Sequence, residues 1–142
     1  MDHNVDPHLR PFPMGYSDAD DWAHIAKDIS GALNAELSDG RVRGGGIGLL
    51  YVSDGLADDL RSIVTFLRQT TEIETWIGTL GLGVVAGANA AFERPAAAAM
   101  VLDVPSDRYR LLPISPIPGR WPDEVMHWAE TVCPSSGIVH GD

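Results

Sequence analysis

The sequence predicts a single α/β domain in which a mixed and mostly parallel sheet carries about three helices on its surface. Three stretches place apolar residues at spacings of three and four, which is typical of amphipathic helices. Short apolar runs alternate with these stretches, as in sheets covered by helices. A chain of 142 residues is also long enough to bury a sizeable core in one domain.

Residues 1–16 are expected to form an extended polar arm, followed by the α/β domain over residues 17–142. The arm carries three prolines, and a proline disfavours helix at the residue before it. Ser17 is expected to cap the first helix, with the acidic residues after it at the positive end of the helix dipole. The buried stripe of this helix comprises Trp22, Ile25, Ala26, Ile29, Leu33 and Leu37.

Residues 47–77 predict a strand, a helix and a second strand. The run from Ile47 to Val52 is apolar on both faces, as expected of an interior strand. Ser53 or Asp54 can cap the helix, and the buried face of this helix comprises Leu56, Leu60, Ile63, Val64 and Leu67. The second strand covers Thr75 to Ile77, and a crossover of this kind joins parallel strands.

The remaining chain predicts more strands and a third helix. Strands are expected at Ala96–Val104 and Arg110–Ile114, with a hairpin turn at residues 106–107 between them. Pro122 lies at the start of the helix, a position that favours proline, and the apolar stripe comprises Val125, Trp128, Ala129 and Val132. Residues 138–140 predict one further strand, so we expect a domain that is truncated at its C-terminal end.

Charge and cysteine content argue against several classes of protein. With 20 acidic and 10 basic residues the net charge is -10, so the surface repels nucleic-acid phosphates and anionic lipids. The single cysteine, Cys133, excludes an internal disulfide and a zinc site with several thiolates. No signal peptide is recognisable, and no apolar run approaches the roughly 20 residues that span a bilayer. We therefore expect a cytoplasmic protein without nucleic-acid or membrane partners.

The most unusual feature is the glycine-rich run Trp76-Ile-Gly-Thr-Leu-Gly-Leu-Gly83. Glycines permit close backbone approach, so their amides can face a ligand carboxylate or carbonyl. The spacing does not match a dinucleotide-binding loop, and the lysine and hydroxyl residue of a P-loop are missing. Two interpretations stay open with nearly equal weight. Either a twisted strand packs closely on a neighbour, or a ligand is bound by Trp76, Gly78, Thr79, Gly81 and Gly83.

No arrangement in the sequence adds up to a catalytic mechanism. The five histidines include no pair at metal-ligand spacing, so no metal site is predicted. His140 is the one candidate ligand or haem contact, and the simpler interpretation is an exposed terminal histidine. Ser53 lacks the G-x-S-x-G context of a nucleophilic serine, and a helical cysteine such as Cys133 is usually inert. We expect that the protein is not an enzyme.

Several motifs follow one another in a recognisable order: Gly48-Leu-Leu-Tyr-Val-Ser-Asp54, Phe66-Leu-Arg-Gln-Thr-Thr71, the run from Trp76 to Gly83, Glu93-Arg-Pro-Ala96 and Val104-Pro105. In order and spacing they resemble the N-terminal part of the FIST domain, and the resemblance covers about residues 20–142. Residues 138–142 resemble a later strand of the same domain. Thr79-Leu80 departs from the polar or cysteine-containing segment that many members have at this place.

The resemblance implies an intracellular sensory module that binds a small, amino acid-like ligand and is coupled to a signalling protein. It implies no obligatory cofactor, although some members of the family are described as haem-based nitric-oxide sensors. A haem-linked gas sensor therefore stays open as an alternative. Another alternative is a protein-interaction module without a ligand, in which the Ala96–Val104 strand or the truncated edge of the domain mediates dimerisation.

Overall fold

The computed structural model describes residues 12–38, 46–112, 121–138 and 140, which belong to two compact units, Met1–Arg108 and Tyr109–Asp142. The first unit contains the strands and two of the helices: β1 (Met14–Ser17), α1 (Trp22–Leu37), β2 (Ile47–Ser53), the 3-10 helix η1 (Asp54–Asp59), α2 (Leu60–Thr71), β3 (Thr75–Gly81), β4 (Gly83–Ala86), β5 (Asn89–Phe92) and β6 (Ala97–Leu102). The second unit contains α3 (Asp123–Val132). None of the described helices combines the length and the apolar character needed to cross a membrane.

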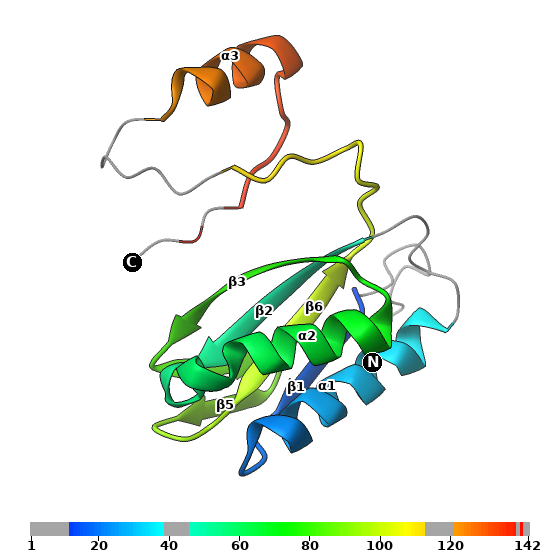
Figure 1. Ribbon diagram of the computed structural model, residues 1–142, viewed down its shortest axis with the longest axis vertical. Coiled ribbons are helices and arrows are strands. Elements are labelled where there is room, and N and C mark those ends of the chain that lie inside the picture. Colours follow the sequence, from blue (N-terminus) through cyan, green and yellow to red (C-terminus); the bar gives the residue numbers. More distant parts are fainter. Residues whose placement is uncertain (1–11, 39–45, 113–120, 139, 141–142) are drawn as a thin grey trace, which may run out of the picture. The chain divides into compact units, whose positions relative to one another are not determined.

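The main sheet has four strands in the order β1-β6-β2-β3 (Figure 1). The expectation of a mixed sheet is confirmed, but the expectation of a mostly parallel sheet is wrong. Only β2 and β3 pair in parallel, whereas β6 pairs antiparallel with both β2 and β1. The reason is that the hairpin of β4 and β5 ends where it began, with Gly83 opposite Phe92, so β6 starts from the end of the sheet at which β3 finished and runs against β2.

Helices α1 and α2 lie side by side over one face of this sheet (Figure 1). Alternate residues of the two central strands point to these helices, including Leu50 and Val52 of β2. The resulting core contains the expected stripes of both helices, with fully buried side chains at Ile25, Ile29, Leu33, Ile63 and Leu67. The predicted helices at both places are therefore confirmed, and β2 is an interior strand as expected.

The start of the domain differs from the expectation. Residues 14–16 of the predicted arm belong to β1, which pairs with β6, and Ser17 ends this strand instead of capping the helix. The Ser17 hydroxyl donates to Asp28 Oδ2 over 2.8 Å. Asp21 is the N-cap of α1, because its carboxylate accepts from the amides of Ala23 and His24. These two hydrogen bonds satisfy donors that the first turn of a helix leaves unpaired.

Other boundaries shift in the second half. β3 runs to Gly81, beyond the predicted end at Ile77, and the β4–β5 hairpin was not predicted at all. The strand expected at residues 96–104 is confirmed as β6. Residues 106–107 form a turn, but it is not the expected hairpin turn, because no strand follows in residues 108–112.

In the second unit, the third helix is confirmed as α3, with Val125 buried. The strand expected at residues 110–114 is absent from the described residues 110–112, and residues 113 and 114 lie outside the described part. Ile138 and His140 are likewise not in a strand, and residue 139 is not among the described residues.

Candidate functional site

The structure places Trp76 on the core side of β3, opposite Gly48 of β2. A side chain at Gly48 would overlap the six-membered ring of Trp76, so the glycine makes room for the indole. The indole Nε1 donates to the carbonyl of Ile73 over 2.8 Å. Because its ring packs on the core and its donor is already paired, Trp76 stabilises the fold and offers no free polar group to a ligand.

Gly78 also has a packing role. It lies opposite Leu50 in the register of β2 and β3, and a Cβ atom at this position would collide with the carbonyl group of Leu50. That group belongs to the backbone of an interior strand, which cannot move without disturbing both neighbouring strands. Of the two interpretations that the sequence left open for the glycines, the geometry supports close packing at this residue.

The other predicted residues follow along the same strand. Thr79 is exposed, and its hydroxyl donates to the carbonyl of Leu80 over 3.2 Å. Gly81 does not have a positive φ, and a Cβ there would lie 3.3 Å from the carbonyl oxygen of Gly83. The structure thus brings five of the predicted residues together along β3 and the start of β4, whereas His140 belongs to the second unit, where it is partly buried.

Sequence reasoning missed the apolar outer face of the β4–β5 hairpin. Val84, Ala86 and Ala91 point inward and pack on Ala96 and Ala98, on the sheet face opposite to α1 and α2. The outward residues are large and apolar. Leu82 is 80% exposed, Val85 66% and Phe92 65%. The alternation of inward and outward residues around Gly87, the one described glycine with a positive φ, was the signal for this hairpin.

We call these three exposed side chains the hairpin surface: Leu82, Val85 and Phe92. Gly83 pairs with Phe92, and a side chain at Gly83 would overlap the Phe92 ring, so the ring lies across this glycine. Val85 is on the same face two residues further along β4, and Leu82 directly precedes β4. Exposed apolar residues gathered in this way mark contact sites, whereas scattered ones are normal.

The hairpin surface begins at Leu82, directly after the end of β3, and β3 itself has an open outer edge. β3 is the last strand in the sheet order, and no strand among the described residues pairs with its outer edge. Its seven residues, TWIGTLG, include neither a charged residue nor a proline, and the stretch from Gly78 to Leu80 is exposed. Sheet edges in natural proteins are usually protected by charges, prolines or bulges, so an edge of this composition is open to another strand.

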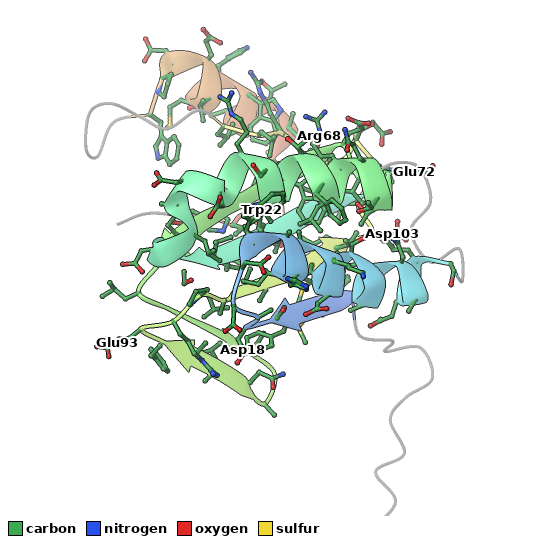
Figure 2. All side chains as sticks on the ribbon, turned by 60° about the horizontal axis from the view of Figure 1, so that its bottom comes forward. Asp18, Trp22, Arg68, Glu72, Glu93 and Asp103 are labelled. Atoms are coloured by element: carbon green, nitrogen blue, oxygen red, sulfur yellow. The ribbon has the colours of Figure 1, made fainter. Side chains whose placement is uncertain are left out.

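Acidic residues surround this region. Because β2 and β3 are parallel, the end of β3 lies beside η1, which carries the exposed Asp54 and Asp58 and contacts β3. Glu93 directly follows Phe92, the last residue of β5, and lies away from the helices (Figure 2). No lysine or arginine occurs between Thr75 and Glu93. The local charge is therefore negative around an apolar centre.

Arg94, the first basic residue after the hairpin, forms an ion pair. Its Nη2 atom lies 2.5 Å from Asp18 Oδ2, at the end of β1. The hydroxyl of Tyr16 lies close to this pair, and burial, followed by the charge of Asp18, raises the pKa of Tyr16. The pair joins the segment after β5 to the segment after β1, and the Asp18 carboxylate balances the positive charge that follows the hairpin.

The start of α1 is the other polar cluster of the first unit. An open depression is lined by Asp18, Asp20, Asp21 and His24. The hydrogen bonds from the backbone and then the side chain of His24 lower the pKa of Asp21, as expected of a helix cap. Among the described residues no group of three histidine, cysteine or acidic side chains could hold a metal ion. This cluster therefore has a structural explanation.

Nucleophilic side chains are also explained by local structure. The buried Ser53 hydroxyl accepts from the amide of Ala96 over 2.9 Å and makes no helix-cap hydrogen bond, contrary to the capping role expected for it. Cys133 is exposed at the end of α3, and its thiol donates to the carbonyl of Glu130. In the same unit, the Arg110 guanidinium lies 5.6 Å from the centre of the Trp128 ring, a cation–π contact.

Comparisons with known proteins do not assign the chain to a family. No family model, no curated protein and no solved structure matches it. The resemblance to the FIST domain stays a prediction from the sequence.

Proposed function

We propose that this chain is an intracellular, non-catalytic recognition module of a signalling system, and that it binds a protein partner through the hairpin surface. One observation carries the proposal: Leu82, Val85 and Phe92 are large apolar side chains at neighbouring positions of one hairpin, and each is largely exposed. Burying such side chains against a partner is favourable by about 1.5–3 kcal/mol each. Aromatic and aliphatic side chains of this kind are the usual anchors of protein interfaces.

Substitution of Leu82 tests this function without threatening the fold. Because Leu82 contributes little to the core, we expect Leu82→Asp to leave the melting temperature unchanged and to weaken partner binding at least about tenfold. A photo-crosslinking amino acid at position 82 identifies the partner in cells, and binding is then measured with both purified proteins.

Thr65→Asp is the matched control, since Thr65 is exposed on α2, which covers the other face of the sheet. The crosslinker at position 65 should not capture the partner, and Thr65→Asp should bind it normally. If the Leu82 and Thr65 variants bind the partner equally well, the hairpin surface is not the interface.

A small ligand is the second candidate, as the resemblance to sensory domains implies. The observation in its favour is the exposed stretch from Gly78 to Leu80, in which the outer backbone groups and the Thr79 hydroxyl are accessible. Backbone amides at an open edge can bind a carboxylate such as that of an amino acid. This site offers no room behind Gly78, where the Leu50 backbone lies.

A thermal-shift assay with single amino acids, and separately with haem, tests whether the protein binds a small ligand. A ligand present at a hundred times its dissociation constant stabilises the native state by about 2.7 kcal/mol, which raises the melting temperature by several degrees. We expect Thr79→Val to reduce such a shift if the threonine hydroxyl contacts the ligand. Absence of a shift with every amino acid and with haem, alongside intact partner binding, would reject the small-ligand candidate.

A further inference from the structure

We infer that the outer edge of β3 accepts an extended segment of the partner as an additional strand, and that this segment is apolar with basic residues at its ends. The inference rests on the proposed function and specifies which chemistry the partner brings. It follows from three observations that meet at one place: an unprotected sheet edge, an apolar surface beside it and an acidic surrounding.

The outer edge of β3 offers backbone amides and carbonyls that can form hydrogen bonds with the partner segment. β3 is seven residues long, and its inner side is paired with β2 along the whole length, from Thr75 opposite Ile47 to Gly81 opposite Ser53. Alternate amides and carbonyls on its outer side have no strand partner among the described residues. The fixed strand therefore presents a preformed row of donors and acceptors, which is what strand addition requires.

The hairpin surface supplies contacts for side chains. A strand added to β3 has side chains that alternate between the two faces of the sheet. The hairpin packs on the face opposite to the helices and follows directly after β3 through Leu82. Apolar side chains of the added strand that lie near the end of β3 can therefore contact Leu82, and this combination gives affinity through backbone and specificity through side chains.

Charge decides between the candidate occupants. A second copy of this chain would bring a further net charge of -10 to a surface that already carries the exposed Asp54, Asp58 and Glu93. Like charges placed opposite each other disfavour association. A segment with lysine or arginine on either side of its apolar residues instead complements the acidic surrounding. The occupant that fits is therefore a basic, extended partner segment.

The test uses the whole chain and a short synthetic peptide of alternating valine and threonine with lysines at both ends. Fluorescence anisotropy of the labelled peptide should show binding that weakens as salt is raised, because the charge contacts are exposed. N-methylation of alternate amides removes the hydrogen-bond donors from one edge of the peptide. The methylated peptide should therefore bind about tenfold more weakly. A peptide with glutamates in place of the lysines should also bind more weakly.

Equal binding of the N-methylated and unmodified peptides overturns strand addition, as does absence of binding by the lysine peptide. Equal binding of the lysine and glutamate peptides overturns the basic character of the segment. These failures are separable from failure of the proposed function. If the partner captured at position 82 still requires Leu82 while no strand peptide binds, the hairpin surface is an interface and only the strand model fails.

Discussion

Gly78→Val is expected to yield no folded protein. The first carbon of any side chain at this position collides with the carbonyl group of Leu50, which is backbone of an interior strand. Overpacking against side chains that can move costs about 1–3 kcal/mol. Here the clash with the Leu50 carbonyl is removed only if β2 and β3 separate. A domain stabilised by only about 5–15 kcal/mol cannot lose this pairing. Soluble yield and far-ultraviolet circular dichroism measure the outcome.

Two other glycines serve as controls for this prediction. Gly81→Val meets only the carbonyl oxygen of Gly83, at 3.3 Å, so this variant should fold with a modest loss of stability. Gly31→Ala in α1 meets nothing within 4 Å and should stabilise the protein by up to about 1 kcal/mol, because alanine favours helix. A Gly78→Val protein that melts like the parent would contradict the packing role and would favour a ligand role for this glycine.

Helices were the part of the fold that the sequence predicted well. In α1 the spacing of Ile25, Ile29 and Leu33 by four residues follows the helical repeat, and all three are fully buried. The pattern of β2, apolar at nearly every position, correctly predicted an interior strand with covered faces. Such patterns are local, since each residue's burial follows from its own place in the repeat.

Strand direction and order could not be predicted in the same way. β6 is apolar and was expected as a strand, but its antiparallel pairing with β2 depends on the hairpin that precedes it. The strands of that hairpin, GVVA and NAAF, have only four residues each, so their alternation of inward and outward residues was too short to be recognised. β1 was missed for the same reason, because a strand of four residues is defined by its partner β6.

The candidate site was half predictable. The run from Trp76 to Gly83 was identified as unusual, and its residues do lie together. Whether each glycine makes room for a neighbour or for a ligand depends on what lies opposite in the next strand, and the register is not encoded locally. The register places Leu50 opposite Gly78 and Phe92 opposite Gly83. These two glycines therefore make room for a neighbour. The hairpin surface was missed because its hairpin was missed.

Trp76 and Gly48 are expected to show strong energetic coupling in a double-mutant cycle. Trp76→Ala removes a ring that packs on the core and leaves the Ile73 carbonyl without its donor, which should cost about 3 kcal/mol. Gly48→Ala alone forces a methyl group into the Trp76 ring and should cost about 1–3 kcal/mol. In the double variant the methyl group enters space that the ring has vacated, so the second substitution should cost almost nothing.

Urea unfolding of the four proteins measures the coupling, with equal slopes as the condition for comparing their free energies of unfolding. Gly55→Ala is the control, because open space surrounds Gly55 and its effect should add to that of Trp76→Ala. Strictly additive costs for the Gly48 and Trp76 substitutions would show that the indole does not occupy the place above Gly48. The ring would then be available to a ligand, and the interpretation of Trp76 as a packing residue would have to be abandoned.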